Sequence, residues 1–259
     1  MKVSVGQFAP TGSVEENLET MDHWAEQASI DGSSLVLFPE EAMLAVGKVQ
    51  GPLAAAVEHE WSGFVQGLSF IAAKHSIAIV AGGYEGSGES RPYNTLVVID
   101  ATGRILGTYR KIHLYDAFSY QESTRIMPGD PEAVAVFEID GLKFGVQTCY
   151  DLRFPELSRR LALADADVLL VSAAWFKGEH KIEHWETLLK ARAMENTVWV
   201  AAAGTSSTHT IGHSAILDPM GVPVGFLGDE RSGMVSAEVS RRRIEEVREF
   251  LPVLANRRL

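Results

Sequence analysis

The spacing of apolar residues along the chain predicts an alternation of strands and helices. Residues Lys2 to Gln7 alternate between polar and apolar side chains, as in a strand with one buried face. Ser13 and Glu16 then form a capping box, a pattern that predicts the start of a helix, and Gly32 predicts its end. Apolar residues that recur every three or four positions predict a second helix from about Val57 to Lys74.

The rest of the chain predicts many more strands, joined partly by hairpins and partly by helices. Apolar or alternating runs predict strands over residues 35–38, 77–82, 95–100, 105–110, 134–139, 142–148, 168–171, 198–203, 213–217, 222–226 and 234–239. Periodic runs predict helices over residues 154–163 and 181–195 and a short basic helix near the C-terminus. Because hairpins give antiparallel pairs and helical crossovers give parallel ones, the sheet should be mixed. We therefore expect an α/β layered sandwich formed by one domain over residues 1–259.

Composition and charge narrow the classes of partner. The chain has 259 residues, of which 46% are hydrophobic, with a formal net charge of -11 and a pI near 5.2. This acidity disfavours nucleic acid and anionic membranes, which attract clustered Lys and Arg, so the run Arg241 to Arg243 is interpreted as a solvated helix face. We recognise no signal peptide and no apolar run near the roughly 20 residues of a membrane span. The only cysteine, Cys149, excludes an intrachain disulfide and favours a cytoplasmic protein.

Three groups suited to catalysis come at or just after the ends of predicted strands. They are Glu40, Lys111 and Cys149. A group at the end of a buried strand is held rigidly at the rim of the sheet. A carboxylate, an amine and a thiol supply a proton acceptor, a positive charge for an oxyanion and a nucleophile, which amide hydrolysis requires. The segment 112–132 is predicted to be a long loop and holds a further carboxylate, Glu122.

The chemistry of amide hydrolysis gives each of these groups a role. Glu40 would take the proton of Cys149, pass it to the departing ammonia and then activate the water that cleaves the thioester. Lys111 would hold the oxyanion together with the backbone N–H of Tyr150, and Glu122 would steady Lys111 or the water. Spacing alone is weak support for these roles, because a free cysteine is more often a buried core residue.

The sequence around each group closely resembles a motif of the nitrilase superfamily of carbon-nitrogen hydrolases. The three motifs are LVLFPE at residues 35–40, YRKIHLY at 109–115 and CYDLRFPEL at 149–157. The resemblance continues through residues 184–196, 212–221 and 251–258 and so spans almost the whole chain. It implies a Glu-Lys-Cys triad of Glu40, Lys111 and Cys149, and it supports Glu122 as a second active-site glutamate. It also implies a four-layer αββα sandwich, usually paired into homodimers or higher homo-oligomers, without a metal or organic cofactor.

The motif that begins at Cys149 is most similar to the branch of deaminated-glutathione amidases and omega-amidases, which favour carboxamides over nitriles. This resemblance implies hydrolysis of a small aliphatic carboxamide to a carboxylate and ammonia. An N-carbamoyl amidohydrolase or a nitrilase with the same triad is the alternative. Arg153 is interpreted as structural support, and Trp175 either as a wall of the substrate pocket or as a core residue. Glu41 is interpreted as a solvated neighbour of Glu40 in preference to a pocket charge.

Other classes of protein have weaker support. His180 with His184, and His209 with His213, have the i, i+4 spacing of zinc ligands, but neither pair has the H-E-x-x-H pattern of a metallohydrolase. No histidine lies in a segment that resembles a Cys-His protease. A binding or scaffold protein on the same fold is the alternative outside the enzymes, and the presence of all three proposed catalytic groups argues against it.

Overall fold

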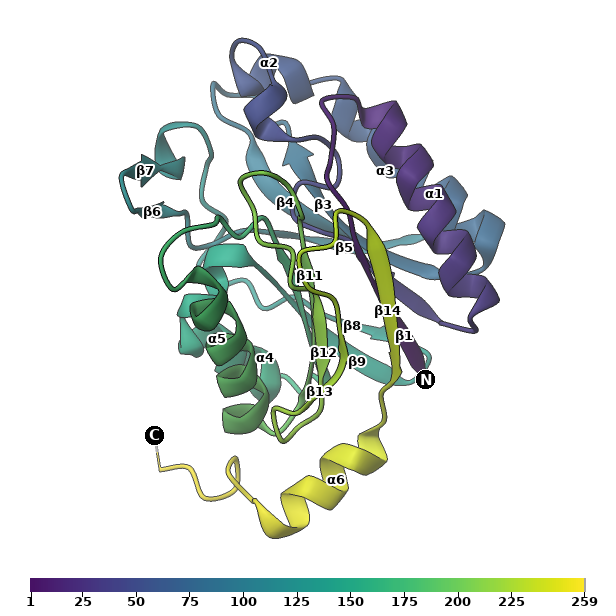
Figure 1. Ribbon diagram of the computed structural model, residues 1–259, viewed down its shortest axis with the longest axis vertical. Coiled ribbons are helices and arrows are strands. Elements are labelled where there is room, and N and C mark those ends of the chain that lie inside the picture. Colours follow the sequence, from purple (N-terminus) through teal and green to yellow (C-terminus); the bar gives the residue numbers. More distant parts are fainter. Residues whose placement is uncertain (259) are drawn as a thin grey trace.

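The computed structural model describes residues 1–258 and consists of two β-sheets packed face to face, with helices on both outer sides (Figure 1). The first sheet contains β1 (Lys2–Gln7), β2 (Leu35–Leu37), β3 (Ala78–Glu85), β4 (Tyr93–Ile99), β5 (Ile105–Arg110) and β14 (Gly233–Glu238). Their order across the sheet is β14-β1-β2-β3-β4-β5. β1, β2 and β3 are parallel, whereas β14, β4 and β5 are antiparallel to their neighbours. β14 pairs with the whole of β1, so residues from both ends of the sequence lie side by side.

The second sheet is also mixed. It contains β8 (Val136–Ile139), β9 (Leu142–Thr148), β10 (Val168–Ala173), β11 (Trp199–Gly204), β12 (Ala215–Leu217) and β13 (Pro223–Phe226). Their order is β13-β12-β11-β10-β9-β8, with β9, β10 and β11 parallel and a hairpin at each edge. The predicted mixed pairing is therefore present in both sheets.

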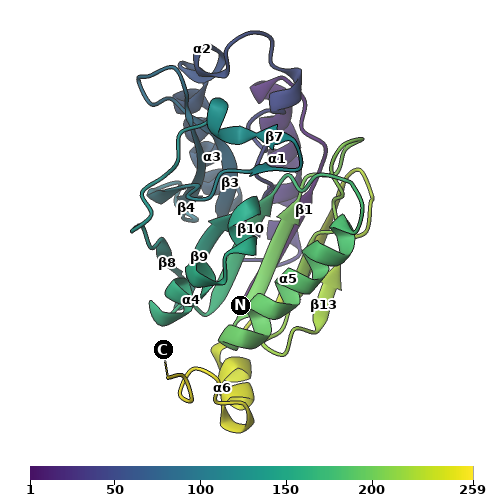
Figure 2. The same ribbon diagram turned by 90° about the vertical axis from the view of Figure 1, so that its left-hand side faces the viewer.

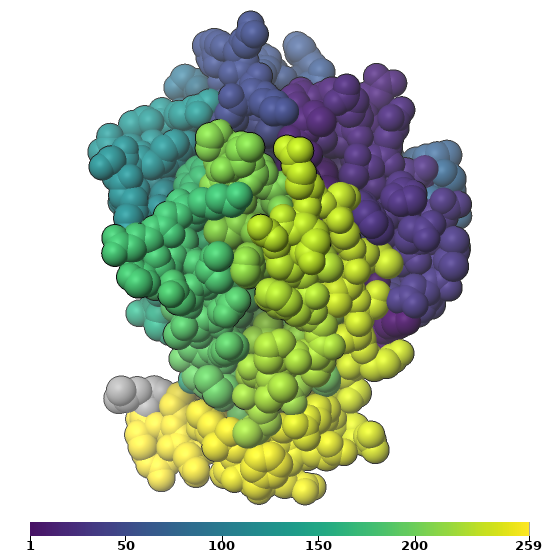
Figure 3. Space-filling view, viewed as in Figure 1, coloured from purple at the N-terminus to yellow at the C-terminus, as the bar shows by residue number. Residues whose placement is uncertain are grey.

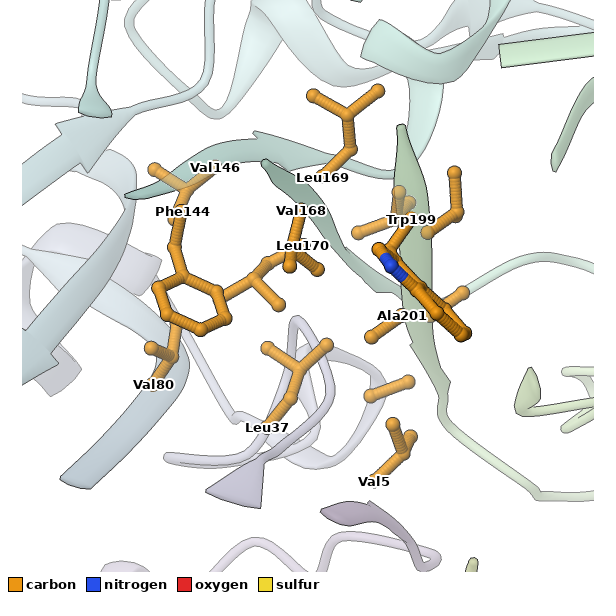
Figure 4. Close-up of a cluster of buried hydrophobic side chains, with 14 of the residues drawn as sticks. Val5, Leu37, Val80, Phe144, Val146, Val168, Leu169, Leu170, Trp199 and Ala201 are labelled. Carbon is orange, nitrogen blue, oxygen red and sulfur yellow. The ribbon is translucent and has the colours of Figure 1, made fainter. Parts of the chain in front are cut away.

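Alternate side chains of the two sheets fill the space between them (Figure 4). Because successive residues of a strand point to opposite faces, Leu35 and Leu37 of β2 join this central cluster, whereas Val36 between them does not. Val36 belongs to a second cluster on the outer face of the first sheet. From the second sheet, the fully buried side chains of Phe144, Val168 and Leu170 complete the central cluster.

Helices cover the outer faces of both sheets. α1 (Val14–Ile30) and α3 (Glu60–His75) cover the first sheet, and α4 (Pro155–Leu163) and α5 (Lys181–Asn196) cover the second (Figure 2). α1 begins where the capping box predicts, because the side chain of Ser13 accepts a hydrogen bond from the N–H of Glu16 at 3.3 Å. The four-layer αββα order implied by the family resemblance is therefore confirmed.

The remaining helices are short or terminal. They are the α-helices α2 (Leu53–Val57) and α6 (Arg241–Phe250) and the 3₁₀ helices η1 (Val46–Lys48), η2 (Glu122–Thr124) and η3 (Cys149–Arg153). α6 and residues 251–258 form the end of the molecule opposite α2 (Figure 3). Arg241 pairs with Asp167 at 2.6 Å and Arg243 with Asp218 at 2.8 Å, but their side chains remain 49% and 37% exposed, and that of Arg242 is 85% exposed. The basic run therefore lies on a solvated helix face, as the sequence predicts.

Two predicted segments differ from the structure. The helix predicted from Val57 to Lys74 is interrupted after α2, which turns Leu53 and Val57 into the core before α3 begins at Glu60. The loop predicted over 112–132 contains η2 and a small hairpin of β6 (Asp116–Ala117) and β7 (Tyr120–Gln121). Among residues 1–258, none of the helices has both the length and the apolar character that a membrane crossing requires.

Candidate active site

Glu40 lies in a turn that follows β2 and rests on β3. The N–H of Phe38 donates to the carbonyl oxygen of Val80 at 2.8 Å, and the N–H of Gly82 donates to the carbonyl oxygen of Pro39 at 3.2 Å. A Cβ atom on Gly82 would lie 2.2 Å from the carbonyl oxygen of Glu40. Only glycine therefore allows β3 to approach the turn this closely.

The carboxylate of Glu40 is 4% exposed and accepts three hydrogen bonds. Oε1 accepts from Lys111 Nζ at 2.8 Å and from Asn94 Nδ2 at 2.7 Å. Oε2 accepts from the N–H of Ala174 at 2.7 Å. Since Ala174 follows β10 in the second sheet, this last bond joins the two sheets at the site.

Lys111 directly follows β5, and its ammonium group lies between two carboxylates. Besides Glu40, Nζ contacts both carboxylate oxygens of Glu122, at 2.9 and 3.1 Å. Glu122 is itself fixed, because its Oε2 accepts from the N–H of Tyr115 at 2.6 Å. All three charged side chains are buried, so each depends on these contacts to replace the water that it has lost.

Cys149 directly follows β9 and is the first residue of η3. Its φ is +47°, in the left-handed region that residues with a side chain rarely adopt. Asp151 supports this sharp turn, because its carboxylate accepts from the N–H of Thr148 at 2.9 Å. Cys149 as a whole is 8% exposed.

Asp151 also joins the segment of Cys149 to the segment of Lys111. The hydroxyl of Tyr109 donates to Asp151 Oδ2 at 2.6 Å, and the N–H of His113 donates to Oδ1 at 3.0 Å. Tyr109 and His113 stand on either side of Lys111 in the sequence. One fully buried carboxylate therefore fixes the relative positions of the two segments.

The surroundings of the three groups favour an ionised Glu40 beside a protonated Cys149. Burial alone would raise the pKa of Glu40, but the charge and hydrogen bond of Lys111 outweigh burial and lower this pKa. Burial raises the pKa of Cys149 well above its ordinary value, and the negative charge of Glu40 adds to this effect. Burial would lower the pKa of Lys111, but Glu122 and Glu40 raise it well above its ordinary value. The resting site thus pairs a neutral thiol with a carboxylate and an ammonium.

These groups line a pocket of about 590 Å³, including the space at its open mouth. Its lining is formed by Glu40, Glu41, Val46, Leu53, Tyr84, Lys111, Tyr115, Tyr120, Glu122, Arg125, Ile126, Cys149, Tyr150, Ala174, Trp175, Phe176 and Lys181. A pocket with mainly aromatic and aliphatic walls and several charged groups suits a small organic molecule.

The other residues that the sequence singles out lie in or beside the pocket. Tyr150 lines it, and its ring packs edge-on against that of Tyr115, with 5.0 Å between the ring centroids. Trp175 lines the pocket and is also buried, so it fits both interpretations of this residue. Arg153 does not line the pocket; its guanidinium carbon lies 4.7 Å from the centroid of a Trp175 ring, a position compatible with structural support.

Sequence reasoning misses two polar residues of the site and misjudges a third. Asn94 holds Glu40, but in the sequence it is an ordinary polar residue in a strand. Lys181 begins α5, where a lysine is normally solvated, yet it is only 5% exposed. The interpretation of Glu41 as a solvated neighbour is wrong, because Glu41 lines the pocket and accepts a hydrogen bond from the hydroxyl of Tyr84 at 3.2 Å.

The spaced histidines lie apart from this site. His180 contacts Glu179 and Glu183 near the start of α5, and His213 Nδ1 lies 3.4 Å from Glu186. Within residues 1–258, no group of three or more His, Cys, Asp or Glu side chains is arranged to hold a metal ion.

Comparison with known sequences gives matches over nearly the whole chain. The carbon-nitrogen hydrolase family matches residues 2–249. A deaminated glutathione amidase from Escherichia coli O157:H7 is 39% identical over 259 residues, which cover 100% of this chain and 97% of that protein. A 2-oxoglutaramate amidase from Bacillus subtilis is 34% identical, covering 93% of this chain and 91% of that protein.

Solved structures with the same architecture include an amidase from Nesterenkonia sp. AN1. It superposes with a TM-score of 0.86 at 27% identity, covering 100% of this chain and 94% of that one. In that structure, a variant of the amidase carries the acetamide moiety of fluoroacetamide bound covalently to its active-site cysteine. A carbon-nitrogen hydrolase from Helicobacter pylori G27 has a TM-score of 0.92 at 24% identity, covering 100% of this chain and 95% of that one, and supports the fold alone.

Proposed function

Because the chain belongs to the carbon-nitrogen hydrolase family, whose amidases act on non-peptide C–N bonds, we propose that it hydrolyses a small aliphatic carboxamide to a carboxylate and ammonia through a thioester on Cys149. The observation that carries the proposal is a single pocket lined by Glu40, Lys111 and Cys149, in which Glu40 and Lys111 are in contact at 2.8 Å. The mainly apolar walls of the pocket favour a small aliphatic substrate.

In the first half of the proposed reaction, the sulfur of Cys149 attacks the amide carbon. The raised pKa of Cys149 keeps the resting sulfur protonated, so formation of the S–C bond is coupled to transfer of the thiol proton to Glu40. The C–N bond then breaks as Glu40 delivers this proton to the nitrogen, and ammonia leaves. The acyl group stays on the sulfur as a thioester.

In the second half, water replaces ammonia. Glu40, again ionised, takes a proton from water while the water oxygen attacks the thioester carbon. The C–S bond breaks, the product leaves as a carboxylic acid that then loses its proton, and Cys149 regains the thiol proton from Glu40. The lowered pKa of Glu40 ensures that it carries a negative charge at the start of each half.

The negative charge on the carbonyl oxygen needs fixed donors in both halves. We assign this role to Lys111 Nζ and to the backbone N–H of Tyr150, which follows the nucleophile. Glu122 is assigned a positioning role, because both of its oxygens contact Lys111 Nζ and one also accepts from the N–H of Tyr115. These contacts leave Glu122 little freedom to shuttle protons.

The proposal is tested by measuring ammonia release from aliphatic amides, half-amides of dicarboxylic acids, N-carbamoyl amino acids and nitriles. We expect the carboxamides to be hydrolysed fastest, and Cys149→Ala to abolish turnover. Met194→Ala is a matched control, since it truncates a sulfur-containing side chain that is 43% exposed and is not part of the pocket lining. Ammonia release that survives in Cys149→Ala would refute the mechanism.

The same panel separates the alternatives. If N-carbamoyl compounds or nitriles were turned over faster than carboxamides, the proposed catalytic triad would stand, but the proposed substrate class would be wrong. Rapid alkylation of Cys149 by iodoacetamide, slowed by a carboxamide, distinguishes an enzyme from a scaffold in which the thiol is inert. Cys149 is the only cysteine, so labelling has no competing site.

We also propose a cytoplasmic homodimer or higher homo-oligomer, without nucleic acid or membrane partners. The acidic net charge of -11 supports the absence of such partners. The family resemblance supports the assembly, as do the large apolar side chains left exposed on the edge strand β13, namely Val222 beside it and Val224 and Phe226 within it.

A further inference from the structure

Glu41 is a carboxylate in the wall of the pocket that the reaction described above does not use. It directly follows Glu40 in the turn that rests on β3, and it lines the same pocket as Cys149. The hydroxyl of Tyr84 on β3 donates to Glu41 Oε1 at 3.2 Å, and Tyr84 is only 4% exposed. A buried tyrosine therefore holds one oxygen of this carboxylate in place at the pocket.

The carboxylate of Glu41 has no cationic partner in the described part of the chain. Among residues 1–258, no Lys, Arg or His nitrogen lies within 4.0 Å of it. Lys111 is held by two other carboxylates. Lys181 also lines the pocket, but its ammonium group contacts the hydroxyl of Tyr115 at 2.8 Å instead.

The charges around Glu41 favour a cation in this part of the pocket. Burial raises the pKa of Tyr84 well above its ordinary value, and the charges of three carboxylates raise it further. These carboxylates are Glu41, Glu40 and Glu122. The pKa of Glu41 itself is raised to about 7, chiefly by burial and by the charge of Glu40. An incoming cation would offset the repulsion between the carboxylates, whereas a neutral group would leave it in place.

The polar atoms that Glu41 and Tyr84 offer to a ligand are hydrogen-bond acceptors. An ionised carboxylate only accepts, and the proton of the Tyr84 hydroxyl already points to Glu41, which leaves the phenol oxygen as an acceptor. An ammonium group has three N–H donors and a positive charge, so it matches both the acceptors and the negative potential.

We propose that Glu41 and Tyr84 bind an ammonium group of the substrate, so that the preferred substrates are carboxamides whose short aliphatic chain carries a protonated primary amine. This inference rests on the amidase function proposed above. The reacting amide would lie at Cys149, and the ammonium group would lie against the Glu41 carboxylate and the Tyr84 oxygen. Glu41 thus acts as a specificity-determining residue that takes no part in bond cleavage.

The test compares pairs of amides of equal size. The charged members are β-alaninamide, γ-aminobutyramide and δ-aminovaleramide, and their partners are butyramide, valeramide and caproamide, in which a methyl group replaces the ammonium. At pH 8 we expect kcat/KM to favour the charged member of the best-fitting pair by about ten- to a hundred-fold, the range for hydrogen bonds to a charged group.

The preference should also increase as the pH rises from 5 to 8. Glu41 becomes ionised through this range, whereas an aliphatic ammonium group stays charged. The ratio of the two kcat/KM values should therefore rise with the ionised fraction of Glu41. Titration of Cys149 affects both amides of a pair and cancels in the ratio.

The other charged groups around this carboxylate do not explain such a rise. Glu40 has a lowered pKa and Lys111 a raised one, so both keep their charge over the range. Tyr84 and Tyr120 have raised pKa values and stay neutral. Glu122 stays in contact with Lys111.

Glu41→Gln keeps the size of the side chain and removes its charge. It should bring the ratio of kcat/KM values close to one, mainly by raising KM for the charged amide, and should abolish the rise with pH. Glu58→Gln is the matched control, because Glu58 is exposed, lies outside the pocket lining and should leave the ratio unchanged.

A binding measurement complements the kinetic one and requires neither turnover nor a substituted chain. At pH 8 in the unmodified protein, butylammonium should slow alkylation of Cys149 by iodoacetamide, whereas the neutral alcohol butanol should not. Equal protection by the two compounds would overturn the proposed ammonium site even if Glu41→Gln does not fold.

The outcomes separate this inference from the proposed function. No preference for the charged member of any pair, a preference that does not rise with pH, or an unchanged ratio in a folded Glu41→Gln would overturn the role of Glu41 and leave the amidase proposal intact. Absence of Cys149-dependent ammonia release from every amide would overturn both. A ratio that falls in Glu41→Gln but not in Glu58→Gln supports the inference.

Discussion

At the scale of single residues, the site depends on a cluster of buried charges that are stable only together. Lys111 lies between Glu40 and Glu122, and the side chains of all three are less than a tenth exposed. Removing one member of such a cluster destabilises the fold by more than the intact cluster stabilises it. The partners that remain are left charged, buried and without water. The same contacts that would orient the reacting groups therefore also determine how the core tolerates substitution.

Lys111→Met should lower the free energy of unfolding by about 3–5 kcal/mol at pH 8, because it leaves two buried carboxylates unpaired. Without the ammonium, the pKa values of these carboxylates rise in the folded state, so the protein binds protons on folding and the loss becomes smaller as the pH falls. Urea unfolding of the variant and of the unmodified protein at two pH values measures this loss of stability. Lys74→Met is the control: it breaks a pair with Asp22 in which the lysine side chain is 44% exposed, and should cost less than about 1 kcal/mol. A loss for Lys111→Met as small as that of the control would contradict the argument.

Glu41→Gln should stabilise the protein above neutral pH. The pKa of Glu41 is raised from 4.5 to about 7, so the folded state binds a proton more tightly than the unfolded state, and stability falls as the pH rises through this window. Removing the charge should raise the free energy of unfolding by roughly 1–3 kcal/mol at pH 8 and have little effect on it at pH 4. Urea midpoints at the two pH values measure the difference; an equal effect at both would exclude titration of Glu41 as its cause.

The sequence indicates the proposed catalytic carboxylate, ammonium and thiol far better than the residues that hold them. Glu40, Lys111 and Cys149 stand out because each comes at or just after the end of a predicted strand and lies in a segment that resembles a motif of the nitrilase superfamily. Asn94 and Lys181 do not stand out, because their burial results from contacts between segments that are distant in sequence. Glu41 is misjudged for the same reason: its surroundings include Tyr84, which lies on another strand.

At the scale of elements, the ends of strands from both sheets meet at the pocket. β5 leads into Lys111, β9 leads into Cys149, and the residue after β10 donates to Glu40. The sequence predicts the bounds of β5 and β9 correctly, because both are short runs limited by clear turns. It predicts β2 one residue too long, to Phe38 instead of Leu37, because Phe38 is as apolar as the strand that precedes it.

Gly82→Ala should reduce activity without changing any charged group. The added methyl group would lie 2.2 Å from the Glu40 carbonyl oxygen, so the turn that carries the carboxylate must move. We expect kcat/KM to fall by about a hundred-fold, as when a reacting group is misplaced by roughly 1 Å. Gly63→Ala, in an open position of α3, should keep full activity and stabilise the helix by up to about 1 kcal/mol. Steady-state ammonia release with both variants tests this, and full activity in Gly82→Ala would show that the turn can adapt.

At the scale of the whole molecule, the proposed site exists only when the two sheets are correctly docked. The bond between Glu40 and the N–H of Ala174 connects the first sheet to the second, and the hydroxyl of Ser172 donates to the carbonyl oxygen of Phe38 nearby. The layered fold follows from the sequence, because the alternation of apolar residues fixes which face of each strand is buried. The relative placement of the two sheets does not follow from the sequence, because it depends on how side chains such as Phe144 and Leu170 pack between them.

The expected assembly is tested on the intact protein. Light scattering in solution should give a mass of at least twice the 28.2 kDa of one chain. The apolar side chains exposed on β13 would then lose area to water on association, which favours pairing. A mass equal to one chain across the micromolar range would refute the proposed oligomer.

The pairing of β14 with β1 has a consequence for biosynthesis. Lys2 lies opposite Glu238, so β1 is synthesised long before the strand with which it pairs. Until residues 233–238 emerge, the nascent polypeptide carries an open sheet edge that other polypeptides could join. Contacts so distant in sequence are slow to form, and we expect the edge of β1 to be closed only after residues 233–238 have been synthesised.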